Sequence, residues 1–431
     1  MSFTNRLRYI DLSFFQRFRY LDISRFYLLK KRQIALSLFY AAMLFAFLSS
    51  LRVWFCWPFV NNYALFSTML LVPSMLISNS MDHPIYDRKD AFWPTIFVGI
   101  MLLYMLLVQE ITVIAFLMLF FRVFVFFALF RISPSFHSHF ATLFSKILAC
   151  MLGISLLMFI LFHLGLNLPG RNAEFSETYR FTNYYFFLIR DWGQVMLIPR
   201  FQAFFLEPGH MGTAIVLLLA TQVGQMKKWY NIILLIALLF SFSLAAYVLL
   251  VIVMLLHLWM KRKRIIAKIL FVSVLIAIIL GSASVYNGGD NMLNQLIFMR
   301  LQMNEEGDDI EGNNRVTSSF QTEYDSFLQS SDVFFGRKVN QDIMHGNAGF
   351  KVFVYTYGFV GFILCYLTYF IAMHKAFDRR AFWAMIVLSL ANFMVRAYPF
   401  WMGFFISYYL LAFVHPSNLA LGTRGKEDSY D

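Results

Sequence analysis

Long apolar runs separated by short polar segments dominate the pattern along the chain. A helix that crosses a bilayer needs roughly 20 mostly apolar residues. Residues 229–260 form one apolar stretch that is too long for one straight helix, and Ser241-Phe242-Ser243 in its middle predicts a break. With that break, the pattern predicts twelve membrane-spanning helices, at residues 33–50, 62–80, 91–109, 111–130, 140–165, 209–225, 229–243, 244–260, 265–282, 349–373, 381–396 and 399–415.

The composition supports a membrane protein. Of the 431 residues, 60% are hydrophobic, 19% are aromatic and only 14% are charged, whereas a soluble domain has about 25% charged residues. One globule cannot bury this much apolar surface, so an ordinary soluble enzyme is excluded, as are a disordered chain and a collagen-like fibre. The predicted fold class is therefore all-α and polytopic. Three scattered cysteines are too few for a disulfide framework or a zinc site.

The positions of the positive charges predict the orientation in the membrane. Short loops on the cytoplasmic side of a bilayer are enriched in Lys and Arg. With the N-terminus inside and twelve helices, every short inner loop is basic, and the net charge of +12 indicates no nucleic-acid partner. Residues 1–32 are basic and amphipathic, without a cleavable signal peptide, and are expected on the anionic inner leaflet. Both termini are thus predicted to be cytoplasmic.

This topology divides the chain into helical and polar parts. Two long connections face outwards, and long connections in compact proteins are usually functional or disordered. The predicted parts are a cytoplasmic segment (1–32), five helices (33–165), a first outer loop (166–208), four helices (209–282), a second outer loop (283–348), three helices (349–415) and a cytoplasmic tail (416–431).

The first outer loop interleaves aromatic residues with arginines. Rings stack on sugar faces, and guanidinium groups bind phosphate oxygens through two parallel hydrogen bonds. The alternative is an interfacial helix at the headgroup level, where aromatic belts also occur. The second outer loop is acidic, and a solvated acidic stretch is favoured over a divalent-ion site. The arginines of the two loops include Arg171, Arg180, Arg190, Arg200, Arg300, Arg315 and Arg337.

Glu207-Pro208-Gly209-His210 combines candidate chemistry with a helix start. Proline is favoured at the first helical position, so Glu207 is the predicted N-cap and His210 lies in the first turn. Arg200 is within reach if the chain folds back. An acid, an imidazole and a guanidinium thus converge at one membrane boundary, where helix N–H groups favour anions. The alternative is a capped helix start with interfacial polar residues.

Further candidates lie near the tenth and eleventh predicted helices and inside the fourth predicted helix. His345 precedes the tenth helix, although a lone histidine is more often structural. Arg122 and Arg396 lie within or beside predicted helices. Cations at membrane depth are costly and often functional. Arg396 is expected to line a lipid portal.

Three elements carry a resemblance to a known family. They are Glu-Pro-Gly-His at a helix start, Leu-Phe-Ser-Phe-Ser-Leu-Ala-Ala-Tyr at 239–247, and His-Gly-Asn followed by Tyr-Gly-Phe-Val-Gly. Together with the length and the two outer loops, they make residues 195–375 resemble bacterial O-antigen polymerases of the Wzy type. The related O-antigen ligases share the broader pattern.

The resemblance implies a GT-C-like glycosyltransferase of the bacterial inner membrane with a periplasmic site. Such enzymes join undecaprenyl-diphosphate-linked oligosaccharide repeats, and undecaprenyl diphosphate is the leaving group. A chain-length regulator and a flippase are the implied partners, and neither a metal nor another cofactor is implied. The alternatives from the sequence are a ligase that transfers glycan to lipid A-core, or a flippase or transporter.

This chemistry assigns roles to the candidate residues. Arginines that stay charged are suited to stabilise a leaving diphosphate. Arg200 and Arg315 are predicted to bind it first, with Arg180, Arg190 and Arg337 in reserve and Arg396 at the portal. A base for the acceptor hydroxyl is predicted among Glu207, His345 and His210.

Overall fold

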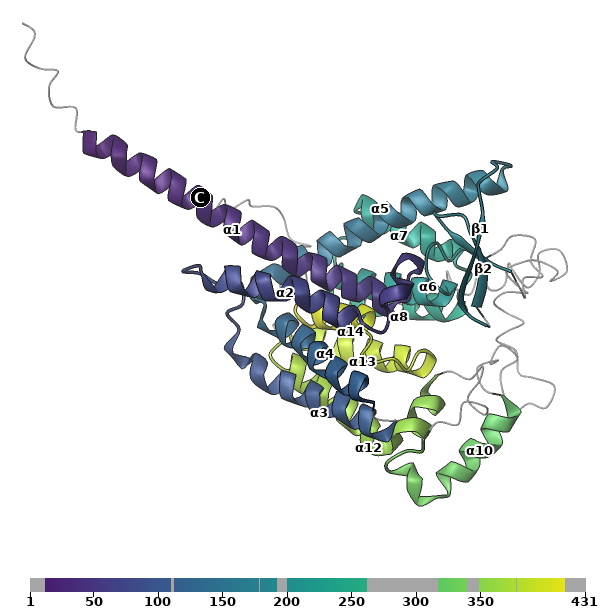
Figure 1. The fold of residues 1–431 in the computed structure, drawn as a ribbon. Coiled ribbons are helices and arrows are strands. Elements are labelled where there is room, and N and C mark those ends of the chain that lie inside the picture. Colours follow the sequence, from purple (N-terminus) through teal and green to yellow (C-terminus); the bar gives the residue numbers. More distant parts are fainter. Residues whose placement is uncertain are drawn as a thin grey trace, which may run out of the picture.

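The computed structural model describes residues 12–109, 112–177, 179–191, 200–261, 317–338, 349–376 and 378–414. This part of the chain is mostly helical (Figure 1). Its main helices are α1 (Leu12–Ser50), α2 (Tyr63–Asn79), α3 (Phe92–Val108), α4 (Val113–Arg131), α5 (His137–His163), α6 (Pro208–Thr221), α7 (Trp229–Phe240), α8 (Leu244–Lys261), α10 (Ser318–Leu328), α12 (Phe350–Met373), α13 (Arg379–Val395) and α14 (Met402–Ala412). Each predicted membrane segment except 265–282, which lies outside the described residues, overlaps with one of these helices, and α1 begins well before the predicted residue 33.

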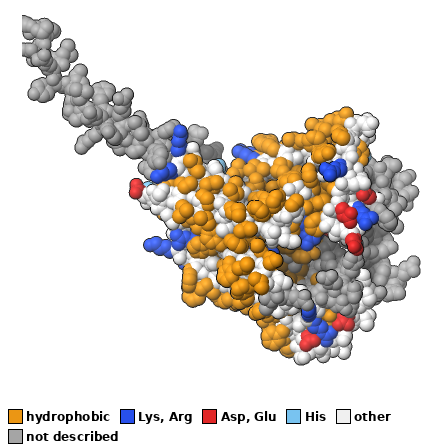
Figure 2. All heavy atoms as spheres, viewed as in Figure 1, with side chains coloured by type: hydrophobic (Ala, Val, Ile, Leu, Met, Phe, Trp, Pro, Cys, Tyr) orange, Lys and Arg blue, Asp and Glu red, His pale blue; other side chains and the backbone are white. Residues whose placement is uncertain are grey.

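Within the described residues, five apolar helices are long enough to cross a membrane: Lys30–Ser50, Lys89–Val108, Val113–Arg131, Pro134–His163 and Phe350–Met373. Shorter apolar helices accompany them. Hydrophobic side chains cover most of the middle of the face in Figure 2, and many charged side chains lie towards its two ends. The N-terminal part of α1 projects from one end of the body in Figure 1, and α10 and a small sheet lie at the other.

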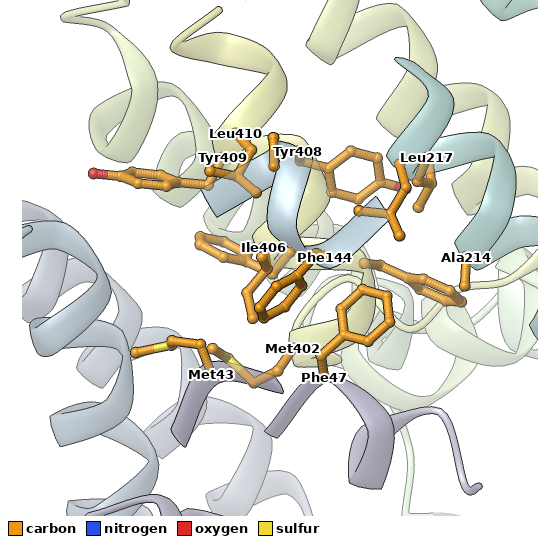
Figure 3. Packing of buried hydrophobic residues seen from close by; sticks show 14 of the residues in the cluster. Met43, Phe47, Phe144, Ala214, Leu217, Met402, Ile406, Tyr408, Tyr409 and Leu410 are labelled. Carbon is orange, nitrogen blue, oxygen red and sulfur yellow. The ribbon is translucent and has the colours of Figure 1, made fainter. Parts of the chain in front are cut away.

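Helices α6 and α14 form the centre of the bundle. All residues of α14 are buried, as are those of α6 after Pro208, and a helix that is hydrophobic all round belongs in a core. Figure 3 shows α14 residues Met402 and Ile406 packed among side chains of α1, α5 and α6. These helices have 14 and 11 residues, so they are about 21 and 17 Å long. Both are shorter than the roughly 30 Å of hydrocarbon in a bilayer.

The short central helices place irregular backbone inside the protein. Non-helical backbone at membrane depth is tolerated only where protein or a water-filled cavity surrounds it. The segments 200–207 and 396–401 precede α6 and α14, and most of their residues are buried. The predicted helix 209–225 is too long at its C-terminal end, because α6 ends at Thr221, and the predicted helix 399–415 extends beyond both ends of α14.

The first outer loop contains a three-stranded antiparallel sheet, which corrects the all-helical prediction and the interfacial-helix alternative. Its strands β1 (Arg171–Ser176), β2 (Tyr179–Asn183) and β3 (Leu188–Arg190) pair in that order. In β2, Phe181 and Asn183 are buried and alternate with the less buried Arg180 and Thr182. This period of two is the strand signal. Phe181 packs with Leu206, so the sheet adjoins the start of α6.

The break predicted at Ser241-Phe242-Ser243 is confirmed, because α7 ends at Phe240 and α8 begins at Leu244. Phe242 has a left-handed backbone with φ 45°. The break packs closely on α6. A Cβ on Gly212 would lie 2.6 Å from that of Ala246, so this contact requires glycine.

Candidate functional site

The Glu207 carboxylate is the centre of a buried polar cluster between β2, α6 and the end of α13. The hydroxyl of Tyr179 donates to Oε1 at 2.5 Å, and Nη2 of Arg396 donates to Oε2 at 2.9 Å. Nε2 of His210 lies 3.8 Å from Oε2. Three segments that are far apart in the sequence therefore meet at one carboxylate. The sequence predicted Arg200 beside Glu207 and His210, whereas the cation hydrogen-bonded to Glu207 is Arg396.

The local sequence explains how Glu207 and His210 are presented. Glu207 has extended backbone before Pro208, which is the first residue of α6. Its side chain is directed at Tyr179 and Arg396. His210 lies in the first turn of the helix, where its ring packs edge-on against Trp401 with centroids 5.3 Å apart. The side chain of His210 is buried.

Arg396 approaches the N-terminal end of α6 closely. A Cβ on Gly209 would lie 2.1 Å from Nη2 of Arg396, so a side chain at this position would displace the guanidinium. The guanidinium is only 9% exposed. A cation near a helix N-terminus is opposed by the helix dipole. The Glu207 carboxylate offsets that repulsion.

Gly209→Ala is expected to destabilise the protein by about 1–3 kcal/mol, the usual range for overpacking, because the methyl group must displace Arg396. Thermal unfolding of the purified protein in detergent measures this. Gly99→Ala is the matched control, since a Cβ there makes only ordinary contacts, the nearest at 3.8 Å from Val123. Equal unfolding temperatures for the two variants would contradict the close approach.

The charges around Glu207 determine its protonation. Burial alone would raise the pKa of Glu207, but His210 and Arg396, together with the hydrogen bonds from Tyr179 and Arg396, hold it well below the usual range. Glu207 is therefore a carboxylate at neutral pH and a weak base. Burial and this carboxylate raise the pKa of Tyr179, so its hydroxyl stays a donor. The cluster is arranged to hold Arg396 and His210 in fixed positions.

A cavity of about 430 Å³ adjoins the cluster. It lies between the end of α1, the helices α2, α3, α4 and α12, and the segment 397–401. The lining includes Arg52, Arg122, Tyr63, Tyr357, Tyr398 and Trp401. Trp401 packs against His210 as well, so the cavity and the Glu207 cluster share a wall. Two cations and several aromatic rings in one cavity favour an anionic ligand with flat or apolar parts.

Arg52 lies at the C-terminal end of α1 in a left-handed conformation with φ 57°. Its N–H donates to Ser49 O at 3.0 Å and that of Val53 to Leu48 O at 3.3 Å, which is a Schellman ending that normally has glycine at this position. The guanidinium lies over Trp401, 5.1 Å from the ring centroid. A strained arginine at a helix end is a pointer to function.

The end of α1 is fixed against the start of α14. The N–H of Gly403 donates to Ser50 Oγ at 2.7 Å, and a Cβ on Gly403 would lie 2.5 Å from Leu51 Cγ. This contact holds Arg52 and Trp401 together.

Arg122 lies in the middle of α4, a helix long enough to cross a membrane. Among the described residues, its buried Nε has no hydrogen-bond partner. A buried polar group without a partner is costly, so it requires an explanation such as an unbound ligand. The cavity beside it provides room for an anion.

The structure brings together some of the predicted site residues and separates others. Arg190 lies over the ring of Tyr179 at 5.0 Å and thus adjoins the cluster. Arg180 is exposed and lies 3.5 Å from Glu174. Arg200 donates to Ser241 O at 3.3 Å, at the end of α7.

The second outer loop contributes less to this site. Arg337 binds Asp332 at 2.6 Å and Glu323 at 2.9 Å, both within that loop. Arg315 and His345 lie outside the described residues.

Sequence reasoning missed Arg52 and Trp401, and it gave Tyr179 only as one of the aromatic residues of the first outer loop. The available signal for Arg52 was a cation at a helix end on the predicted outer side, against the positive-inside pattern. Aromatic residues follow it at Trp54, Phe55 and Trp57.

Among the described residues, no group of three or more His, Cys, Asp or Glu side chains could hold a metal ion. Comparisons with protein-family models, curated proteins and solved structures found no match.

Proposed function

We propose that this chain is a membrane glycosyltransferase that joins polyprenyl-diphosphate-linked oligosaccharide repeats, in the manner of an O-antigen polymerase. The cavity lined by Arg52 and Arg122, which we call the arginine cavity, lies next to the Glu207 cluster. This arrangement is the observation that supports the proposal most strongly. A diphosphate is a double anion, which two guanidinium groups bind well. The motif resemblance supports the same chemistry. The proposal includes twelve membrane-spanning helices with both termini cytoplasmic and the cavity towards the periplasm.

The reaction is a glycosyl transfer at the end of the bundle that holds the cavity. An acceptor hydroxyl attacks the anomeric carbon of the donor, and the bond from that carbon to the diphosphate oxygen breaks. The leaving diphosphate takes the electron pair, and Arg52 and Arg122 stabilise its charge. Arg396, held by Glu207, lines a small neighbouring cavity that shares Pro399 with this one. His345 remains the predicted base for the hydroxyl proton, since ion pairing makes Glu207 a weak base and His210 acts as a charge partner of Glu207.

The test is the gel profile of surface glycan from a strain without this gene, restored with the wild-type chain or with Arg122→Gln. We expect a single-repeat band in place of the ladder after deletion, restoration by the wild type, and no restoration by the variant at equal membrane levels. Glycan lost from the lipid core while lipid-linked polymer accumulates would instead indicate a ligase. Repeats trapped inside the cell would indicate a flippase, and an unchanged ladder would contradict the proposal.

A further inference from the structure

A second cavity, of about 410 Å³, opens sideways between α12 and α13. Its lining is apolar and includes Phe350, Val354, Phe359, Phe362, Leu390 and Met394. We call it the lateral groove. Phe359 and Met394 are 46% and 56% exposed, so the lateral groove is accessible from the side of the bundle.

A kink in α12 shapes the lateral groove. Gly358 has a left-handed φ of 62° inside the helix, and the groove includes residues on both sides of it. The N–H of Val360 donates to Phe334 O at 2.9 Å, and that of Arg337 donates to Tyr355 O at 2.8 Å. Backbone from the second outer loop thus binds groups that the kink frees, so the bend is part of the fold rather than a defect.

The lateral groove adjoins a small cavity that contains Arg396 and lies one aromatic pair away from the arginine cavity. Phe393 lines the groove and also a small cavity that contains Arg396. Phe353 of α12 lines the arginine cavity. The rings of Phe353 and Phe393 pack with centroids 5.0 Å apart. One aromatic pair therefore separates an apolar groove from a cavity lined by cations.

We propose that the lateral groove holds the first isoprene units of the lipid carrier whose diphosphate binds in the arginine cavity. This inference rests on the proposed function. A polyprenyl diphosphate has an anionic head and a hydrocarbon chain directly attached to it, which matches a cationic cavity next to an apolar groove. The remaining chain extends into the bilayer. The carrier can then reach the site sideways, without its chain passing through water.

The role of the lateral groove is to position the chain. Lipid tails are as apolar as the groove, so little affinity comes from removing the chain from the bilayer. Shape and the bound head determine which chain occupies it. An experiment must therefore locate the chain, and affinity alone does not suffice.

The test is photolabelling of the full-length protein in nanodiscs with a benzophenone analogue of farnesyl diphosphate. We expect labelled peptides from the groove-lining parts of α12 and α13, and protection by excess farnesyl diphosphate. Ala391→Trp, which fills the lateral groove, is expected to reduce this labelling at least fivefold. Leu367→Trp is the matched control, because Leu367 lies on α12, is 40% exposed and does not line the groove.

Separate outcomes distinguish the two proposals. Inorganic diphosphate that raises the unfolding temperature, with photolabel found only outside the lateral groove, would contradict the inference and leave the proposed function standing. Equal labelling by a benzophenone phospholipid, without protection by farnesyl diphosphate, would also contradict it, because the groove would then be an ordinary lipid contact. If neither diphosphate compound affects the protein, the proposed function itself fails.

Discussion

Arg52→Gly is expected to lower glycan polymerisation by about 100-fold or more, the usual effect of removing a preorganised charge-stabilising group, while the protein stays folded. Arg52 has a left-handed backbone at a Schellman ending, where glycine is the favoured residue. The substitution therefore relieves backbone strain of about 1 kcal/mol. Lost cation–π contacts with Trp401 and Phe175 offset that gain. Stability should change little.

The measurement pairs the unfolding temperature in detergent with the length of the surface-glycan ladder. Arg180→Ala is the matched control, because Arg180 is exposed and pairs only loosely with Glu174, and it should leave both readouts unchanged. Arg52→Lys keeps the charge and should retain part of the activity. A full ladder from Arg52→Gly at normal membrane levels would exclude Arg52 from the site.

The sequence predicted most of the helices because hydropathy over about 20 residues is a strong signal in membrane proteins. It also predicted the start of α6 and the Glu207–His210 pair, since Pro208 marks the first turn. Contacts between side chains that are close in the sequence could be predicted from the sequence. The break before α8 could be predicted too, because Ser241 and Ser243 interrupt an apolar run.

The sequence could not show which distant residues meet. Tyr179 reaches Glu207 because β2 packs on Leu206, which is a tertiary contact between separate segments. Arg396 was a candidate, but its pairing with Glu207 depends on how α13 ends beside α6. The left-handed backbone of Arg52 has no signature in residue type. Short helices such as α14 look like full spans because apolar residues continue beyond their ends.

Glu207→Ala is expected to destabilise the protein by about 2–3 kcal/mol, the lower part of the range for truncating one partner of a buried charge pair. Arg396 is 9% exposed and would lose its carboxylate partner beside a helix N-terminus, where the dipole opposes a cation. Glu207 itself is 28% exposed, which keeps the expected loss at the lower end. Unfolding in detergent measures the change.

A double-mutant cycle separates the ion pair from the packing around it. Glu207→Ala leaves the Arg396 cation without its carboxylate partner, and Arg396→Ala removes that cation. The double variant should therefore lose less free energy of unfolding than the two single variants lose in sum, by about 1 kcal/mol or more. The cycle Glu323→Ala with Arg337→Ala is the control, since that pair, at 2.9 Å, is 26–32% exposed, and such pairs contribute about 0–1 kcal/mol. Additive effects at Glu207 and Arg396 would show that Arg396 does not depend on the carboxylate. Coupling would mean that the same carboxylate that positions His210 also positions Arg396 in the small cavity next to the lateral groove.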